Sequence, residues 1–417
     1  MSWQTVPLRK LITPNNSRNR PDLPLLSVVR DKGIIKRKLD KSDNHNVIPE
    51  DLSNYKVVKE GQFVINKMKA WQGSCGVSPY EGIVSPAYFV FDLDIENPHF
   101  FNYSIRSRIF VDEFNRISKG IRVDQWDLEL NLLKYVRFPL PPRGEQDQIV
   151  RYLDWKVSQI NKLINAKRRQ IALLGEQKRA VVNKAVTRGG EGWTTRRLKN
   201  VSRLKTGSTP SGNEGINTNN DGFNWYTPSD FGNALYLKAA EKSISADIVQ
   251  RNNTALYDAG SILFIGIGGT TGKVAYCKEP SYSNQQITAI MPQGISGLFL
   301  LYYLAAKSQF IKDTANYTTL PIVNNAQLSA VEVLVPPTEE QANIVEHLEH
   351  NCSQINTAIL KIEEEITLLS DYRTRLISDV VTGKLDVRDV VVPEFEVVED
   401  VAGDVNEVEL GENEHGK

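Results

Sequence analysis

The sequence predicts a mixed α/β fold (α+β), in which two globular domains are joined by two long antiparallel coiled-coil helices with pseudo-two-fold symmetry. Three observations predict it: a long ungapped repeat within the chain, a helical period of apolar residues along that repeat, and opposite net charge on its two copies. A duplication of this length has to be identified first, because it determines the architecture of the whole chain.

The repeat starts at the motif Pro-Pro-x-x-Glu-Gln-x-x-Ile-Val. The motif occupies residues 141–150 and returns at 336–345, a constant offset of about 195 residues. No gap is needed as far as Thr187 and Thr382, and about 17 of 47 positions are identical. The chain therefore contains two copies of one plan.

Each copy of the repeat is predicted to be one long helix. Apolar residues recur at three- and four-residue spacing for about six heptads, which is typical of a coiled-coil seam. A helix of about 45 residues at ~1.5 Å per residue is roughly 65 Å long and needs a partner to bury its seam. The predicted seam residues are Ile149, Leu153, Ile160, Ile164, Ile171 and Leu174 in the first copy, and Ile344, Leu348, Ile355, Ile359, Ile366 and Leu369 in the second.

The charges indicate that the two helices pair with each other. Residues 143–188 carry eleven Lys/Arg and four Asp/Glu, whereas residues 338–383 carry three and nine. Opposite charge beside an apolar seam favours pairing between the copies over pairing of like with like. The second helix starts where the segment after the first helix ends, so we expect it to run back antiparallel.

The repeat divides the chain into five segments. Residues 1–142 are the first head, 143–188 the first spacer helix, 189–337 the second head, 338–383 the second spacer helix, and 384–417 a tail. The tail carries eleven acidic and three basic groups, so it is expected to be disordered. The rest of the chain is then mildly basic, which is compatible with a polyanionic partner.

Bulk composition excludes little. The 417-residue chain has 24% charged residues and no apolar run of membrane-spanning length, and its start, MSWQTVPLRK, lacks a signal-peptide core. Its cysteines, Cys75, Cys277 and Cys352, form no CxxC pair and are expected to be reduced thiols of a cytoplasmic protein. We expect no association with a membrane.

The two heads share an order of elements. In the first head, strands are predicted at 61–65 and 82–91 and a helix from Asn97-Pro98 through Phe114. In the second, a strand at 260–265, a glycine turn, a returning strand at 273–276 and a helix over 298–315 are predicted. The sequences of the two heads have diverged far more than those of the two helices. This pattern is expected if the heads bind two different targets that the helices hold at a fixed distance.

These segments resemble the specificity subunits of type I restriction-modification enzymes. The resemblance covers nearly everything up to about residue 390. It is carried by the repeated Pro-Pro-x-x-Glu-Gln entry, the helix ends at 185–189 and 380–384, the Gly192-Trp193 start, and the segments 68–73, 82–88, 207–211 and 260–274. The acidic tail lies outside the family pattern.

The resemblance implies a function. Each head would be a target-recognition domain for one half of a bipartite double-stranded DNA site. The helices would set the spacing and dock two methyltransferase (modification) subunits, and motor-nuclease (restriction) subunits would join them. It also implies no cofactor in this subunit, since adenosylmethionine, ATP and magnesium belong to the partner subunits, and no catalytic centre.

Two other functions are compatible with this organisation: an adenine methyltransferase or nuclease acting alone, and a coiled-coil scaffold with no DNA role. The glycines at 266 and 268 mimic a methyltransferase cofactor loop, but the residues after them are predicted to form a returning strand and not a helix. Gly272-Lys273 does not complete a phosphate-binding loop, because Ile267 stands where that loop has glycine and Val274 where it has Ser or Thr. His347, His350 and Cys352 could hold a metal, but Cys352 falls on the seam and the histidines do not, so no metal site is expected.

DNA contacts require Arg, Lys, Asn or Gln at base edges and hydroxyl or amide groups at phosphates. Polar side chains in glycine-flanked or polar loops are the candidates. In the first head these are Arg18, Arg20, Lys67, Lys69, Trp71, Gln72 and Tyr80, and in the second Ser208, Thr209, Ser211, Thr270, Thr271, Lys273, Gln285, Gln286, Asn316 and Tyr317.

Overall fold

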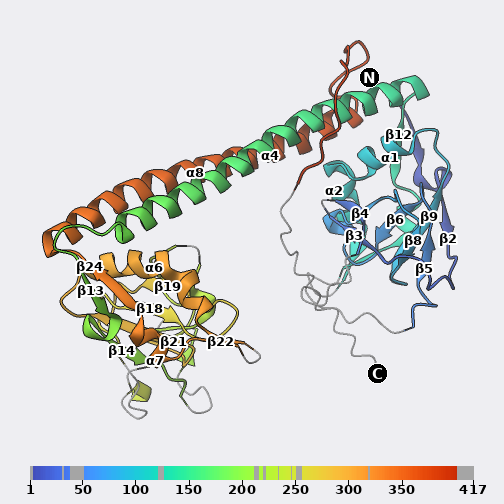
Figure 1. Ribbon diagram of the computed structural model, residues 1–417. Coiled ribbons are helices and arrows are strands. Elements are labelled where there is room, and N and C mark those ends of the chain that lie inside the picture. The colour runs from blue at the N-terminus through green and yellow to red at the C-terminus, as the bar shows by residue number, and fades with distance from the viewer. Residues whose placement is uncertain are drawn as a thin grey trace. The chain divides into compact units, whose positions relative to one another are not determined.

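The computed structural model describes residues 3–30, 32–37, 51–120, 126–210, 216–218, 222–232, 234–245, 247–249, 256–317 and 320–401. They belong to two compact units, both visible in Figure 1. Unit 1 comprises Met1–Arg169 with Ile362–Lys417, and unit 2 comprises Gln170–Lys361. Each unit contains one head and part of each long helix, and the predicted mixed α/β class is confirmed.

The centre of unit 1 is an antiparallel sheet of four strands in the order β2-β9-β6-β7. Its strands are β2 (Ile12–Asn15), β9 (Tyr88–Leu93), β6 (Phe63–Asn66) and β7 (Cys75–Val77). Helices α1 (Pro98–Ile105) and α2 (Arg108–Arg116) contribute Phe101 and Phe114 to the core beside Phe63, all three fully buried.

Shorter elements complete unit 1. The pairs are β1 (Gln4–Pro7) with β12 (Arg137–Leu140), β3 (Leu26–Val29) with β4 (Gly33–Lys36), β5 (Lys56–Val58) with β8 (Gly82–Val84), and β10 (Ser118–Lys119) with β11 (Asp127–Leu128). The short helices are η1 (Leu8–Lys10), η2 (Ala70–Gln72) and α3 (Leu130–Leu133).

Unit 2 repeats this sheet in the order β14-β21-β18-β19. Its strands are β14 (Ser202–Thr206), β21 (Ile287–Pro292), β18 (Ile262–Ile265) and β19 (Val274–Tyr276), covered by α6 (Gly297–Asp313). A second sheet has the order β15-β17-β16-β20, with β15 (Ile216–Asn217), β17 (Ser243–Ile244), β16 (Phe223–Tyr226) and β20 (Tyr282–Ser283). The remaining elements are β13 (Thr194–Arg197) with β24 (Glu332–Val335), β22 (Asn316–Tyr317) with β23 (Pro321–Ile322), η3 (Leu198–Asn200), η5 (Pro228–Asp230) and α7 (Asn325–Ala330).

Strand register aligns the two heads residue by residue. Asn66 lies opposite Tyr88 in unit 1, and Ile265 lies opposite Ile287 in unit 2, each at the end of its strand pair. The turn before β9, Ser85-Pro86-Ala87, is therefore the counterpart of the turn before β21, Asn284-Gln285-Gln286. Each head has its own four-stranded sheet with the same strand arrangement, but the residues of this turn differ between the heads.

The long helices are α4 (Arg143–Thr187) and α8 (Thr338–Val381). In unit 1, Leu153 in the early part of α4 shares a core with Leu376 in the late part of α8. In unit 2, Val186 near the end of α4 shares a core with Leu348 near the start of α8. In each unit the two helix segments therefore run antiparallel, as predicted.

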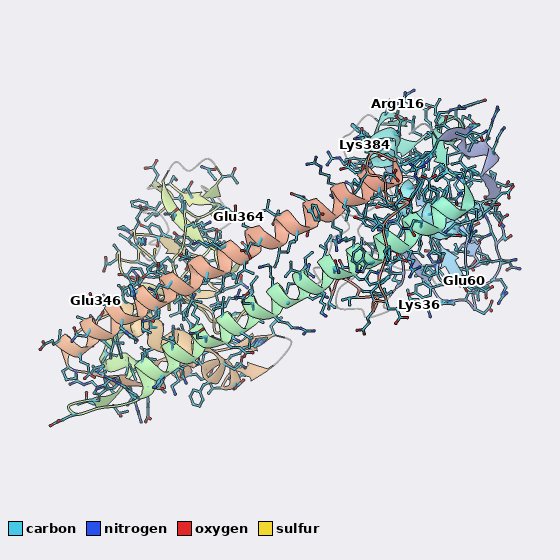
Figure 2. All side chains as sticks on the ribbon, turned by 90° about the horizontal axis from the view of Figure 1, so that it is seen from above. Lys36, Glu60, Arg116, Glu346, Glu364 and Lys384 are labelled. Atoms are coloured by element: carbon cyan, nitrogen blue, oxygen red, sulfur yellow. The ribbon has the colours of Figure 1, made fainter. Side chains whose placement is uncertain are left out.

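The residues predicted to form the seam are buried or half-buried on both helices. Ile149, Leu153, Ile160 and Ile164 on α4 and Ile344, Leu348 and Ile355 on α8 are buried. The others, Ile171, Leu174, Ile359, Ile366 and Leu369, are half-buried. Charged residues lie off the seam, and Figure 2 labels two of them on α8, the exposed Glu346 and Glu364.

One predicted helix is wrong in its extent. The helix expected from Asn97 through Phe114 is two helices, α1 and α2. The break lies at Ser107, whose extended backbone (φ −68°, ψ 156°) starts the second helix. Asn97 caps the first helix by accepting a hydrogen bond from the backbone N–H of Phe100, as its sequence position indicates.

The expectation that the whole tail is disordered is also wrong. Residues 385–401, named here the strap, run along α4 in unit 1 without helix or strand, with one turn at 388–389. Val387 and Val392 are buried in the core of unit 1. Residues 402–417 lie outside the described residues. Composition predicted disorder because it counts charge, whereas the strap buries its apolar residues on a matching surface.

Candidate nucleic-acid interface

The repeated Pro-Pro-x-x-Glu-Gln motif joins each head to its helix. The indole N–H of Trp3 donates to Glu145 at 3.1 Å in unit 1, and that of Trp193 donates to Glu340 at 2.8 Å in unit 2. The glutamine amide of each motif donates to the carbonyl of the first motif proline, at 2.8 Å and 2.9 Å. The motif thus satisfies polar groups at a helix start and fixes the first strand of the head.

A second anchor also occurs in both units. Tyr103 donates to Asp154 at 2.8 Å in unit 1, and Tyr302 donates to Glu349 at 2.8 Å in unit 2. Asp154 and Glu349 are counterparts in the repeat. Burial and the adjacent carboxylate raise the pKa of both tyrosines well above the usual value, so both remain hydrogen-bond donors at neutral pH. These anchors attach each head to a long helix of its own unit, to α4 in unit 1 and to α8 in unit 2.

The second head contains a polar groove of about 520 Å³. It lies where the turn before β21, the β18–β19 hairpin, β16 and the loop after β14 meet. Its lining residues are Thr209, Trp225, Thr227, Pro228, Ser229, Lys242, Ile267, Gly268, Gly269, Thr270, Asn284, Gln285 and Gln286. Amides, hydroxyls, one cation and backbone groups are the functional groups that DNA-reading proteins present.

A close backbone approach forms one wall of this groove. A Cβ on Gly207 would lie 2.3 Å from the carbonyl oxygen of Asn284, so no side chain fits there. The backbone N–H of Ser208 donates to the Ser283 carbonyl at 3.0 Å, which holds the loop after β14 against the turn before β21. Gly207 thereby brings Thr209 beside Gln285.

The floor and the opposite rim of the groove carry aromatic and hydroxyl groups. Trp225 is 4% exposed and its ring lies 5.9 Å from the ammonium nitrogen of Lys242. Thr227 and Ser229 form a hydroxyl pair at 2.7 Å on the rim. A cation over an aromatic ring is stabilised while its charge remains available to a phosphate.

Four of the ten candidates in the second head line this groove. They are Thr209, Thr270, Gln285 and Gln286. Lys273 and Ser208 are half-buried neighbours, and the exposed Asn316 interacts with the Gln327 amide. Thr271 is 3% exposed and donates to the carbonyls of Gly268 and Pro321, so it stabilises the hairpin and presents no group to a ligand. Ser211 and the Tyr317 side chain lie outside the described residues.

The candidates in the first head lie on separate loops. Lys67, Lys69, Trp71 and Gln72 lie between β6 and β7, where Lys67 pairs with Asp127 at 2.5 Å and Trp71 packs against Trp126 at 5.4 Å. Arg18 and Arg20 lie between β2 and β3, bonded to Asn54 and Asp22 respectively. Tyr80 has the Lys36 ammonium 4.9 Å from its ring centroid. Their role in DNA binding stays a prediction.

Sequence reasoning missed Trp225, Thr227, Ser229 and Lys242 in the groove. Trp225 lies on β16, a strand of four residues that pairs in parallel with β20, and Thr227 and Ser229 follow directly after this strand. A parallel pair joins residues far apart in the chain and leaves no local signal. An aromatic residue followed by hydroxyls in a loop was the available clue.

The features weighed as enzymatic or metal-binding have structural explanations. Residues 266–273 connect β18 to β19 as a hairpin, which confirms the predicted returning strand. Cys352 is buried on the seam, and His347 and His350 are exposed. Within the described ranges, no group of three His, Cys, Asp or Glu residues is placed to hold a metal ion. Among those same residues, no helix combines the length and apolar character needed to cross a membrane.

Comparison with known proteins gives a consistent relationship. Residues 190–368 match the family model described as "Type I restriction modification DNA specificity domain". The Type I restriction enzyme MjaIX specificity subunit of Methanocaldococcus jannaschii is 29% identical over 157 residues, 36% of each chain. The EcoR124I/EcoR124II specificity subunit of Escherichia coli is 25% identical over 268 residues, 61% of this chain and 64% of that one. The matched regions thus span less than two thirds of these two relatives.

A solved structure shares the fold over nearly the whole chain. It comes from work on complex assembly and conformational transition of the type I R-M system. Its TM-score is 0.70 at 18% identity, with 92% of this chain and 98% of that chain covered. At this identity the likeness establishes the fold alone, including two sheet-containing heads and paired long helices.

Proposed function

We propose that this chain, which belongs to the family of type I restriction-modification specificity subunits, is the DNA-recognition subunit of such a complex in the cytoplasm. Each head would bind one half of a bipartite double-stranded DNA site. The observation that carries the proposal is the polar groove of the second head, within the segment that matches the DNA specificity domain. The divergence of the two heads on a shared sheet supports two different half-sites.

We propose that the helices serve as spacer and as docking surface for two methyltransferase subunits, with motor-nuclease subunits joining the complex. Large apolar side chains exposed off the seam support a protein partner: Leu163 at 46%, Leu173 at 64%, Leu360 at 65% and Leu368 at 61%. Adenosylmethionine, ATP and magnesium would then be bound by the partner subunits, and this chain would supply recognition without catalysis.

Methylome sequencing tests the proposal directly. A host expressing this chain with its methyltransferase subunits is expected to methylate one bipartite motif with a fixed gap. Cells that lack only this chain are expected to lose methylation at that motif. A methylated motif that is unchanged in those cells would show that the chain does not specify it. Purified chain incubated with DNA and labelled adenosylmethionine separates this proposal from an enzyme acting alone, because transfer by the chain itself would contradict it.

The spacer role has its own test. We expect that one heptad inserted in phase into each helix lengthens the gap between half-sites and leaves both half-sites unchanged, because each heptad adds about 10 Å of helix. The same insertion in only one helix is the control, since it breaks the seam register and is expected to abolish methylation. An unchanged gap after the paired insertion would refute the spacer role.

A further inference from the structure

We propose that Gln285 reads an A·T base pair in the half-site of the second head, with Thr209 as the residue that positions its carboxamide. The proposal rests on the proposed function, since it concerns DNA bound in the same groove. Glutamine recognises adenine by accepting from N6 and donating to N7 in the major groove. Such a contact requires a carboxamide that is exposed in the groove and held in one orientation.

The backbone around Gln285 is fixed on all sides. The N–H of Asn284 donates to the Tyr226 carbonyl at 3.0 Å, and the N–H of Gly266 donates to the Gln286 carbonyl at 2.8 Å. The N–H of Ile287 closes the turn on the Asn284 carbonyl at 3.2 Å. A side chain on such a turn needs little reordering when it binds, which favours specificity.

The carboxamide itself is oriented. Thr209 Oγ1 donates to Gln285 Oε1 at 2.5 Å, while the Gln285 side chain remains exposed on the groove wall. An amide oxygen has two lone pairs, so one stays available beside the two Nε2 hydrogens. An acceptor beside a donor is the pair that the major-groove edge of adenine requires.

The neighbouring glutamine has a different role. Gln286 Oε1 accepts from Asn284 Nδ2 at 2.9 Å, and the backbone N–H of Gln286 donates to Asn284 Oδ1 at 3.1 Å. Gln286 is half-buried beneath the hairpin at Gly268. It supports the turn, and Gln285 is the carboxamide directed outward.

The groove supplies the contacts that would hold DNA around this side chain. The groove is lined by Thr227 between β16 and η5, by Ser229 on η5 and by Lys242 directly before β17. Their ammonium and hydroxyl groups suit phosphate oxygens, which position a duplex without reading its sequence. Gln285 then provides the sequence-reading contact.

The first head lacks this contact. Its counterpart of Gln285 is Pro86, which has no side-chain donor or acceptor. The same turn in the two heads therefore cannot read the same base. A substitution at Gln285 should alter one half-site only.

The test uses the assembled complex with its methyltransferase subunits and maps the methylated motif of each variant. Gln285→Ala is expected to raise methylation about tenfold at sites that carry a non-A·T pair at one position of one half-site, the discrimination lost with one bidentate contact. Thr209→Val is expected to relax the same position more weakly. Gln309→Glu, on the exposed side of α6, is the matched control and should leave the motif unchanged.

An unchanged motif with Gln285→Ala, or relaxation in the other half-site, would overturn the assignment while leaving the recognition role intact. If the wild-type complex methylates no bipartite motif, the proposed function itself fails. If Gln285→Ala gives no methylation at all, the isosteric Gln285→Glu decides. This carboxylate keeps the acceptor and loses the donor, so altered preference at one A·T position supports the assignment and the wild-type motif refutes it.

Discussion

The two units contain the same helix pair and the same head anchors, yet only unit 1 carries a strap among the described residues. Gln148 donates to the carbonyls of Val387 and Val390, at 2.9 Å and 2.7 Å. Asn161 donates to the Val398 carbonyl at 2.8 Å. The strap therefore buries part of α4 that its counterpart on α8 leaves exposed: Asn161 is 5% exposed, and Asn356 is an exposed residue.

The difference in charge between α4 and α8 explains why the strap binds along α4 in unit 1 and not along the corresponding part of α8 in unit 2. Asp400 pairs with Arg168 and, at 2.9 Å, with Arg373. The counterparts of Arg151 and Arg168 in the repeat are Glu346 and Glu363. In unit 1 the acidic strap meets basic residues of α4 together with Arg373 of α8, whereas the part of α8 that carries Glu346 and Glu363 would repel it. The two copies of the helix thus have the same backbone, but their surfaces differ because basic residues of α4 are replaced by acidic residues at the corresponding positions of α8.

The largest expected effect removes a fully buried aromatic from one unit. Phe264→Ala in unit 2 and Phe63→Ala in unit 1 should each destabilise their own unit by about 3–5 kcal/mol, because each leaves a cavity in a separate core. Hydrogen exchange resolved by peptide measures both. If either variant reduced protection equally in both units, the two units would unfold together. That result would contradict the view that their cores are independent.

Removal of the strap should affect unit 1 alone. A chain ending at Lys384 loses the buried Val387 and Val392 and their hydrogen-bonded backbone, at a cost of about 3 kcal/mol to unit 1. Hydrogen exchange is expected to rise over 148–168 and stay constant over 343–360. The matched control ends at Val401 and keeps every strap contact. Unchanged exchange over 148–168 in the shorter chain would mean that the strap does not stabilise α4.

The tyrosine anchors should stabilise both units, but by unequal amounts. Tyr103→Phe and Tyr302→Phe each remove one hydrogen bond to a carboxylate, with an expected loss of about 1–2 kcal/mol in the affected unit. Denaturant unfolding followed by hydrogen exchange measures it. A larger loss for Tyr103→Phe is expected because Glu349 keeps a second donor, Tyr236, and Asp154 has no other donor among the described contacts.

The smallest expected effect is a pH dependence of the strap. Burial opposes ionisation of Asp400, but hydrogen bonds from Arg168 and Arg373 outweigh it and lower its pKa below the ordinary 3.8. Its contribution, about 1 kcal/mol or less in this partly exposed setting, is complete above pH 3.8 and is lost as the pH falls through the lowered pKa. Protection over 158–168 should therefore fall in acid for the wild type, and the Asp400→Asn chain should lack that acid-dependent step.

The sequence alone determined the duplication, the helix pair and its direction, because period and charge sign persist over many residues and need no knowledge of distant contacts. It also located four groove residues, Thr209, Thr270, Gln285 and Gln286, because polar residues in glycine-flanked loops or in a short polar run before a strand are a local signal.

Tertiary structure alone decided the strap and the rest of the groove. The strap is bound by side chains more than 200 positions away in the chain, such as Gln148 and Asn161, which donate to its backbone carbonyls. Every residue has a backbone carbonyl that can accept a hydrogen bond, so these contacts do not require a particular residue type in the strap. The composition of the strap therefore shows only its acidic charge. Likewise, the groove depends on Gly207 letting one loop touch another and on a parallel pairing of β16 with β20. Contacts of this kind arise only when distant parts of the chain pack together. Unlike the apolar residues of the long helices, the residues that make them do not recur at a regular spacing in the sequence.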